Sequence, residues 1–452
     1  MKTNIAAKST DITHGGAVTR TGNPEQVLRR SVMSCLLWED QFYEDGVAIA
    51  DRITETAKLV STDTLKALAV EARTKFNLRH VPLMLLLELV RRGGSGVADA
   101  VSDTICRADE MAELLALYWR NGRKPIPKQM RLGLAKAFGK FDEYQLAKYD
   151  GDGAVKLRDV MFMCHPKPAD DARAALYERV AQRKLVVPDT WEVQLSGGAD
   201  KKDTFERLIA EGRLGYMALL RNLRGMTDAG VDRNLITQAI LARKGADKVF
   251  PFRFLSAAEA APGFEGALDQ AMLDGLALER KLPGTTVIVV DVSGSMYHTR
   301  VSGKSKITRI DAACSLAALA REVCEDPIVY ATAGNDMTRI HATGLVPARH
   351  GMALIDAIRD MPKTLGGGGI FLKQVMEYIR AQNGNIDRVI VITDEQDCSG
   401  HGDSPLSAPI IGRMNYMINV ASYRNGVGYG NWTHIDGFSE AVIRYIREYE
   451  GI

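Results

Sequence analysis

Cysteine is scarce in this sequence, and its few cysteines are not paired. The six cysteines are scattered over 452 residues, and no two of them have Cys-x-x-Cys spacing. This scatter argues against a disulfide framework or a zinc site and fits a reducing cytoplasm. No apolar run approaches the roughly 18 residues that a membrane span needs, and Met1 to Val18 lack the apolar core of a signal peptide. We therefore expect a cytoplasmic protein that contacts no membrane.

The usual sequence signatures of catalysis are also missing. There is no Gly-x-x-x-x-Gly-Lys-Ser/Thr phosphate loop, and only Cys164 has a histidine, His165, as its neighbour. Adjacency in the sequence does not make these two side chains face each other, as a nucleophile and its base must. We therefore expect that the protein is not an enzyme.

The first part of the chain has a helical pattern. From Asn23 to about Arg280, apolar residues recur at three- and four-residue spacing, and short breakers such as Pro125–Pro127 separate the segments. Many helices joined by tight turns predict a helical-hairpin solenoid of HEAT type, although no crisp sequence repeat is present. A chain of this length predicts about two or three domains, and we assign residues 1–280 to the helical one.

The pattern changes at Pro283-Gly284. Thr285–Val290 is a continuous β-branched run, which is typical of a strand buried on both faces. Strands and helices then alternate, so residues 281–452 are expected to form a doubly wound, mainly parallel α/β domain. The other expected strands are residues 328–332, 388–393 and 417–421, and the expected helices are residues 307–324, 352–359, 371–381 and 439–449.

The first expected strand runs directly into an Asp-x-Ser-x-Ser motif, formed by Asp291, Ser293 and Ser295. Residues two apart on an extended turn point the same way, so one carboxylate and two hydroxyls converge at the end of the strand. A second carboxylate, Asp394, follows the strand at residues 388–393, and the carboxyl ends of parallel strands are where such sheets bind ligands. Hard oxygen ligands of this kind suit Mg²⁺, with Mn²⁺ or Ca²⁺ as alternatives. A purely structural cluster without metal is the other interpretation.

The motif resembles the metal-ion-dependent adhesion site of von Willebrand factor A-like domains. That family usually supplies one more ligand, a Thr just after a Gly-rich turn. Here the turn is Leu365 to Phe371, with Gly369 or Ile370 at the expected position, and Thr364 comes too early. Since neither Gly369 nor Ile370 has a side-chain oxygen, we expect weaker metal binding, completed by water.

Positive charge is concentrated between Arg120 and Lys148. This segment contains eight basic residues and two acidic ones, Asp142 and Glu143. Its net charge is therefore +6, which leaves −4 for the rest of the chain. Such a segment is either a solvated helix face or the footprint of a polyanion site. Phe138, Phe141, Tyr144 and Tyr149 are interleaved with these bases, and aromatic side chains stack on unpaired RNA bases. Phe138 and Phe141 fit a core position better than a stacking role.

Nearly the whole chain resembles the TROVE-domain proteins, the family of the Ro autoantigen, in bacterial or phage form. The most specific match comprises Leu146–Tyr149, Val155–Val160 and Cys164–Pro168, which follow the family's Lys-Tyr, helix start and His-x-Lys-Pro pattern. Asp152 departs from it, because the family commonly has Arg four residues after the Lys. The resemblance makes Lys148 and His165 candidates for RNA contact. Together with the basic segment, the candidate RNA-binding residues are Lys128, Arg131, Lys136, Lys140, Lys148, Tyr149 and His165.

The resemblance also implies an architecture and a function. In the Ro family the helical repeats bend into a ring that the α/β domain closes. Y RNAs bind its outer face, and single-stranded ends of misfolded small RNAs enter the hole. A monomer in RNA quality control or decay is therefore expected, in a ribonucleoprotein with a Y RNA-like RNA and an exoribonuclease such as polynucleotide phosphorylase. The alternative is a metal-dependent adhesion module that binds a protein and no RNA.

Overall fold

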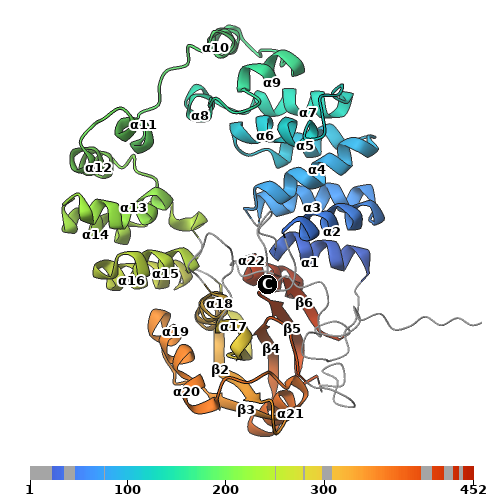
Figure 1. The fold of residues 1–452 in the computed structure, drawn as a ribbon, viewed down its shortest axis with the longest axis vertical. Helices are drawn as coiled ribbons and strands as arrows, with labels where there is room; N and C mark the ends of the chain where they lie inside the picture. The colour runs from blue at the N-terminus through green and yellow to red at the C-terminus, as the bar shows by residue number, and fades with distance from the viewer. Residues whose placement is uncertain are drawn as a thin grey trace, which may run out of the picture. The chain divides into compact units, whose positions relative to one another are not determined.

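In the computed structural model, the regular elements described in the first part of the chain are all helices, as the apolar periodicity predicts (Figure 1). The structure describes residues 23–34, 46–75, 77–249, 251–277, 280–297, 308–398, 410–421, 431–436 and 441–452. Met1–Val18 and Cys35 lie outside these ranges. The helices up to Gly198 are α1 (Pro24–Ser34), α2 (Gly46–Leu59), α3 (Thr62–Thr74), α4 (His80–Arg92), α5 (Val97–Thr104), α6 (Ala108–Tyr118), α7 (Lys128–Phe138), α8 (Glu143–Lys148), α9 (Leu157–Cys164), α10 (Asp171–Gln182) and α11 (Trp191–Ser196).

These helices pack against near neighbours in the sequence, which is how a repeat array buries its apolar faces. Helix α3 contacts α4 and α5, α5 contacts α7, and α7 contacts α9. The approach of α7 to α5 requires glycine, because a Cβ at Gly133 would lie 2.7 Å from the carbonyl oxygen of Ala98. Pro24–Met33 and Ala50–Gly198 form one compact unit, which we call the helical unit.

The second compact unit, called here the mixed unit, contains the described residues of Ala199–Ile452. It begins with α12 (Lys201–Ala210), α13 (Tyr216–Asp228), α14 (Arg233–Ala242), η2 (Ala246–Lys248), α15 (Pro251–Ala260), η3 (Pro262–Phe264) and α16 (Glu265–Ala277). The sheet part comprises β1 (Leu282–Asp291), α17 (Gly294–Tyr297), α18 (Arg309–Val323), β2 (Cys324–Asn335), β3 (Ile340–Leu345), α19 (Gly351–Asp360), α20 (Pro362–Leu365), α21 (Leu372–Gln382), β4 (Ile386–Thr393), β5 (Gly412–Asn419), β6 (Thr433–Asp436) and α22 (Ala441–Glu450).

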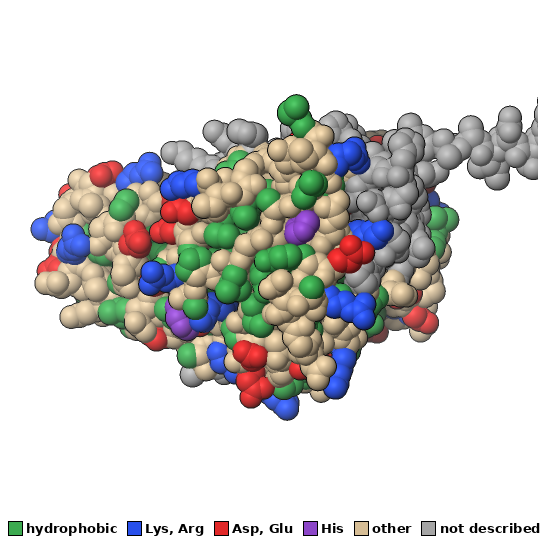
Figure 2. Space-filling model, turned by 90° about the horizontal axis from the view of Figure 1, so that it is seen from below, with side chains coloured by type: hydrophobic (Ala, Val, Ile, Leu, Met, Phe, Trp, Pro, Cys, Tyr) green, Lys and Arg blue, Asp and Glu red, His purple; other side chains and the backbone are tan. Residues whose placement is uncertain are grey.

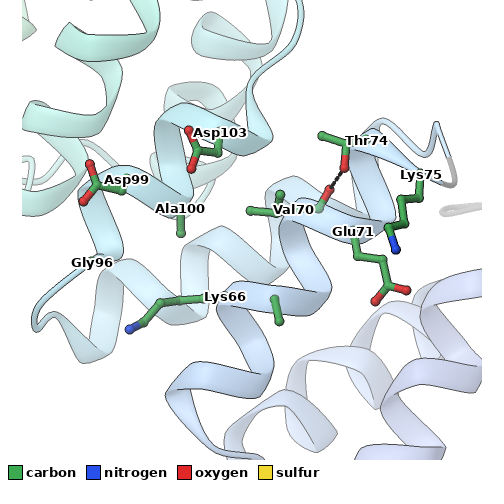
Figure 3. Close-up of a pocket in the computed structure, with 10 residues that line it drawn as sticks. Lys66, Val70, Glu71, Thr74, Lys75, Gly96, Asp99, Ala100 and Asp103 are labelled. Carbon is green, nitrogen blue, oxygen red and sulfur yellow. Dashed lines mark hydrogen bonds between the residues drawn. The ribbon is translucent and has the colours of Figure 1, made fainter.

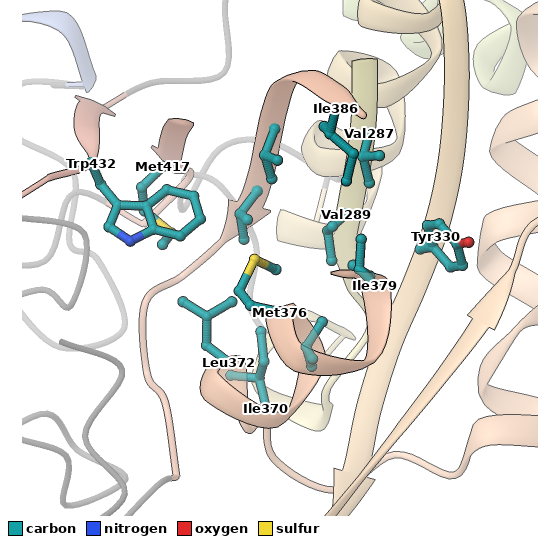
Figure 4. Packing of buried hydrophobic residues seen from close by; sticks show 13 residues of the cluster. Val287, Val289, Tyr330, Ile370, Leu372, Met376, Ile379, Ile386, Met417 and Trp432 are labelled. Carbon is teal, nitrogen blue, oxygen red and sulfur yellow. The ribbon is translucent and has the colours of Figure 1, made fainter. Parts of the chain in front are cut away.

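The sheet is mixed but mainly parallel, with strand order β3-β2-β1-β4-β5-β6. Only β3 is antiparallel to its neighbour, β2. Val287 and Val289 of β1 point to the face that α21 covers, where Met376 joins the same buried cluster (Figure 4). Since side chains alternate along a strand, Ile288 and Val290 point to the other face, and α18 also contacts β1. Both faces are thus covered, which explains the continuous apolar run.

The α/β alternation predicted from the sequence is confirmed, but two strands were missed. Strands β3 and β6 stand at the two edges of the sheet, and neither has the apolar run of a central strand. β-Structure begins at Leu282, next to the expected domain boundary at residue 280, which itself stays a prediction. By packing, the helices α12–α16 group with the sheet, because α15 and α16 contact α18. No helix in the described ranges is long and apolar enough to cross a membrane.

Candidate functional site

The candidate RNA-binding residues Lys136, on α7, and Lys140, just after it, are both bound to α5. The ammonium of Lys136 lies 2.5 Å from a carboxylate oxygen of Asp99 on α5. Lys140 donates to the carbonyl oxygens of Ser102 and Ile105, at the C-terminal end of α5, with 2.6 Å to the second. Burial of its ammonium lowers the pKa of Lys140. Both side chains therefore hold α7 against α5, where helix-end carbonyls favour cations, and a phosphate would have to displace these bonds.

Lys128 and Arg131 are exposed and lie three residues apart on α7, which places them on neighbouring parts of one helix face. Burial raises the pKa of the Cys164 thiol to about 12, and the charge of Arg131 opposes this shift. Arg131 therefore lies near the end of α9, next to the residue that precedes His165. The high pKa also makes Cys164 a poor nucleophile.

The end of α8 carries cations over aromatic rings. The ammonium of Lys148 lies 5.9 Å from the ring centre of Tyr144 and 5.8 Å from that of Tyr149. The guanidinium carbon of Arg107 lies 4.4 Å from the ring centre of Tyr149. Tyr144 is half exposed, and Lys148 is exposed. Lys148 and Tyr149 therefore lie together, with Arg107 as a third member that the sequence pattern did not single out.

Helix α9 presents a second set of residues on one face. Arg158, Phe162 and His165 are four and three residues apart, so they align along the helix. Phe162 is 51% exposed, and the guanidinium carbon of Arg158 lies 5.9 Å from its ring centre. His165 ends the helix in the left-handed region, at φ +49°, and its side chain is exposed. Arg158 and Phe162 were not predicted from the sequence. A signal was present, because Leu157, Val160, Met161 and Cys164 have helical spacing and Phe162 lies outside that apolar face.

Other residues of the basic segment are structural. Phe138 and Phe141 are buried, which confirms that they belong to the core. The ring of Phe138 contacts that of Tyr177 edge-on, with centroids 5.3 Å apart. Asp152 forms ion pairs with Lys156 (3.0 Å) and Arg183 (2.9 Å), so the acidic residue that departs from the family pattern has its own partners.

An open groove of about 600 Å³ lies between α3 and α5 of the helical unit (Figure 3). Its lining mixes lysines, carboxylates and small apolar residues. Three of its charged residues already have partners: Lys66 pairs with Asp63, Glu71 with Arg29, and Asp99 with Lys136. The groove therefore does not concentrate charge of one sign. The face shown in Figure 2 is similar in this respect, since basic, acidic and apolar side chains are interspersed on it.

The mixed unit brings the Asp-x-Ser-x-Ser motif together at the carboxyl end of β1. The amide of Ser293 donates to one oxygen of Asp291 (2.9 Å), and the hydroxyl of Thr393 donates to the other (2.6 Å). The hydroxyl oxygens of Ser293 and Ser295 are 3.3 Å apart. The three predicted metal-ligating side chains therefore converge, and they are oxygen donors of the hard type.

Asp394 reaches the same place from the end of β4, but its carboxylate has a cation already. The guanidinium of Arg309, the first residue of α18, lies 3.1 Å from Asp394, and both side chains are buried. Burial raises the pKa of Asp291 to about 7, and the neighbouring Asp394 adds to the shift. Two buried carboxylates that lie close together repel each other unless a cation or a proton neutralises them. Arg309 supplies one such positive charge.

The surroundings of Gly369, Ile370 and Thr364 show which of them could supply the Thr ligand of the metal site that the motif resembles. Ile370 is 2% exposed and packs in the core under the sheet, so its side chain is turned away. Gly369 faces the loop after β4: a Cβ there would lie 2.1 Å from the sulfur of Cys398. The amide of Gly369 donates to Asp336 (2.7 Å). Thr364 donates its hydroxyl to the Met361 carbonyl (2.9 Å). A Thr ligand therefore has no room at position 369.

These donors fit a hard divalent cation that is held loosely. Asp291, Ser293 and Ser295 supply a carboxylate and two hydroxyls, and water would have to complete the coordination. Among the described residues there is no group of three or more His, Cys, Asp or Glu side chains that could hold a metal ion more tightly. Asp394 would have to share its charge between the cation and Arg309.

Comparisons with known proteins find similarity in sequence over part of the chain and similarity in fold over nearly all of it. The family model of the TROVE domain matches residues 172–343. Telomerase protein component 1 from Rattus norvegicus and from Mus musculus are each 34% identical over 108 residues, which cover 23% of this chain and 4% of the relative. The chain thus spans only a small part of these curated relatives. The Deinococcus radiodurans Ro (RSR) structure is similar with a TM-score of 0.65 at 15% identity, covering 95% of this chain and 99% of that chain.

The match to the TROVE-domain family model therefore begins near the end of the helical unit and continues into the sheet. In fold, the chain is similar to the Deinococcus protein over nearly the whole length of both chains. At 15% identity this likeness concerns the fold alone. The matched residues 172–343 include Asp291, whereas the candidate RNA-binding residues up to His165 lie before them.

Proposed function

We propose that this protein binds RNA through the ends of α8 and α9 in the helical unit. The observation that carries the proposal is the pair of cation and aromatic sets there, Lys148 with Tyr149 and Arg158 with Phe162 beside His165. Cations neutralise phosphates and supply most of the affinity for RNA. Exposed aromatic rings stack on unpaired bases. Lys128 and Arg131 extend the positive surface, while Lys136 and Lys140 contribute charge from positions bound to α5.

The resemblance to Ro supports a narrower form of this proposal. The RNA would be a Y RNA-like or misfolded small non-coding RNA with single-stranded ends, and the process would be RNA quality control or decay in the cytoplasm. The helical repeats would be of HEAT type, closed into a ring by a von Willebrand factor A-like domain. We further propose that the protein is a monomer and acts together with an exoribonuclease such as polynucleotide phosphorylase. The chain itself would have no catalytic role.

A matched pair of double variants tests RNA binding. Lys148→Gln/Phe162→Ala removes one exposed cation and one exposed aromatic ring from the proposed surface. Loss of a stacked base alone costs about 1–3 kcal/mol, so affinity should fall about tenfold or more, and the slope of log affinity against log salt should fall by about one. Fluorescence anisotropy with a labelled hairpin RNA that has a single-stranded tail measures both quantities.

The control is Lys58→Gln/Leu59→Ala, which also removes one cation and one exposed apolar side chain. Lys58 pairs with Glu55 (2.5 Å), and Leu59 is 70% exposed at the end of α2. The control should bind RNA like the parent protein. Equal affinities of both double variants and the parent at every salt concentration would refute the proposed surface. A protein that binds no RNA at all would favour the adhesion alternative.

We also propose that Asp291, Ser293 and Ser295 hold a divalent cation, Mg²⁺ with Mn²⁺ or Ca²⁺ as alternatives, with Asp394 contributing directly or through water. The pKa of Asp291 is raised to about 7 by burial, so a proton competes with the cation below that pH. Affinity for Mg²⁺, measured by titration calorimetry, should therefore rise from pH 6 to pH 8.

Asp291→Asn should remove both the cation binding and its pH dependence, since the amide carries no charge to neutralise. RNA affinity should be unchanged in this variant, because the proposed RNA surface belongs to the helical unit. Mg²⁺ or Mn²⁺ binding that persists after Asp291→Asn would show that the cation is held elsewhere, and the structural interpretation of the motif would then stand.

A further inference from the structure

The loop between α6 and α7 is a pre-formed platform with two aromatic rings. The hydroxyl of Tyr118 donates to the carbonyl oxygen of Pro125 (2.8 Å), and the indole N–H of Trp119 donates to that of Lys124 (2.9 Å). Gly122 has φ +105°, a backbone conformation that lets the chain reverse there. The polar ends of both rings are therefore fixed to the loop backbone, and their orientation does not depend on a ligand.

Each ring is accompanied by an exposed cation from the same loop. The ammonium of Lys124 lies 4.3 Å from the ring centre of Tyr118, and the guanidinium carbon of Arg123 lies 5.4 Å from that of Trp119. The rings are partly buried, whereas both cations are exposed. The sequence has no Asp or Glu between Glu113 and Asp142. The loop thus offers positive charge beside aromatic faces without an acidic residue of its own segment to neutralise it.

We propose that this loop is a second contact for RNA, one that binds unpaired nucleotides. A planar guanidinium and aromatic faces are surfaces on which exposed bases stack, and Arg123 and Lys124 would neutralise the adjoining phosphates. Bases inside a duplex are already stacked on one another, so the platform favours single strands. The inference rests on the proposed RNA-binding function, and it names a site separate from Lys148, Phe162 and His165.

The test uses the full chain with Arg123→Gln/Lys124→Gln, exposed positions where a shorter polar side chain leaves both ring hydrogen bonds in place. The control, Lys58→Gln/Arg91→Gln, makes the same charge change in the same unit at cations that pair with Glu55 (2.5 Å) and Glu88 (2.7 Å). The probes are a labelled single-stranded oligouridylate of about 20 nucleotides and an RNA duplex of the same length. Anisotropy at several salt concentrations measures both affinities.

The loop variant should bind the single strand about tenfold more weakly, with a salt slope lower by about two because two phosphate contacts are lost. Its duplex affinity should change much less, and the control should match the parent. Crosslinking of oligouridylate that contains 4-thiouridine should modify the peptide with Tyr118 and Trp119, and the loop variant should reduce this crosslink.

Other results overturn the inference. An unchanged single-strand affinity, or crosslinks only outside this loop, removes the loop as an RNA contact. Equal losses for single strand and duplex reduce it to a phosphate contact without base stacking. If the variant at Lys148 and Phe162 still weakens binding in those cases, the proposed function stands while this inference fails. Absence of RNA binding by the parent protein would instead remove both.

Discussion

Arg388→Met should lower the free energy of unfolding of the mixed unit by about 3–5 kcal/mol, because it leaves a buried carboxylate without its cation. Arg388 on β4 and Glu450 at the end of α22 have side chains that are 3% and 7% exposed. The Nε and Nη2 atoms of Arg388 donate to the two carboxylate oxygens of Glu450, and the Nε contact is 2.7 Å long. Arg388 also donates to the Thr286 hydroxyl (2.8 Å), and the hydroxyl of Tyr416 donates to Glu450 (2.7 Å).

This network attaches the last helix to the central strands. After Arg388→Met, Glu450 keeps the bond from Tyr416 as its remaining hydrogen bond within the described residues, and the hydroxyl of Thr286 loses Arg388 as its donor. A buried charge without a partner costs far more than the pair itself is worth, since the pair has already lost its hydration. Arg388→Met/Glu450→Gln removes both charges and should therefore recover a large part of the stability. Such a recovery would distinguish electrostatic loss from simple loss of packing.

Arg413→Met is the matched control on the neighbouring strand β5. Its guanidinium lies 3.7 Å from Asp387, but its side chain is 85% exposed, so water screens the pair. An exposed pair is worth about 0–1 kcal/mol, and this variant should unfold almost like the parent. Urea unfolding, with hydrogen exchange of the amides of β1 and β4 as the local readout, measures all three variants. Equal effects of Arg388→Met and Arg413→Met would show that the buried network does not stabilise the sheet.

Sequence periodicity was sufficient for the central elements of the fold. The expected helix at residues 307–324 is α18, and the expected strand at residues 388–393 lies within β4. Both carry their signal within one segment: α18 starts with a capping box from Thr308 to Asp311, and β4 contains the apolar run Val389–Ile392. β3 carries no such signal, because its residues are partly exposed at the sheet edge and its pairing with β2 comes from tertiary contact.

The candidate sites show the same difference between features set by one segment and features set by contacts between distant segments. Asp291, Ser293 and Ser295 are close in the sequence, so their convergence could be predicted from a turn alone. The ion pair of Arg309 with Asp394 joins residues 85 positions apart, and no local pattern announces it. The count of charged residues identified the basic segment but could not predict which partner each ammonium binds. Lys140, for example, donates to a carbonyl oxygen at the end of α5. Where a charge is used depends on which helices pack together.

Gly369→Thr, which places a Thr where von Willebrand factor A-like domains have their ligand, should destabilise the mixed unit, although it adds a hydroxyl near the proposed cation site. A Cβ at this position would lie 2.1 Å from the sulfur and 3.0 Å from the Cβ of Cys398, as well as 3.0 Å from a carboxylate oxygen of Asp336. Cys398 is held in place, since its amide donates to the Ile370 carbonyl (2.9 Å) and its own carbonyl accepts from Arg339 (2.6 Å). Overpacking of this kind costs about 1–3 kcal/mol.

Gly367→Thr is the control within the same run of glycines, because a Cβ there meets no atom within 4 Å. It should leave stability nearly unchanged, whereas Gly369→Thr lowers the urea midpoint. Cys398→Ala removes the nearest clashing atom, so Gly369→Thr should cost less in that background, by about 1 kcal/mol of coupling. If the two substitutions at Gly367 and Gly369 destabilise equally, the crowding at Cys398 is not what keeps position 369 a glycine.

The same double variant also tests the cation site. With Cys398→Ala making room, the hydroxyl introduced by Gly369→Thr can join Asp291, Ser293 and Ser295 as another hard oxygen donor. Mg²⁺ affinity should then exceed that of Cys398→Ala alone, and Asp291→Asn should abolish the gain. An unchanged Mg²⁺ affinity in a folded double variant would mean that position 369 does not face the cation. In the expected case, crowding by Cys398 and the charge of Arg309 on Asp394 would both lower the affinity of the proposed site for a cation.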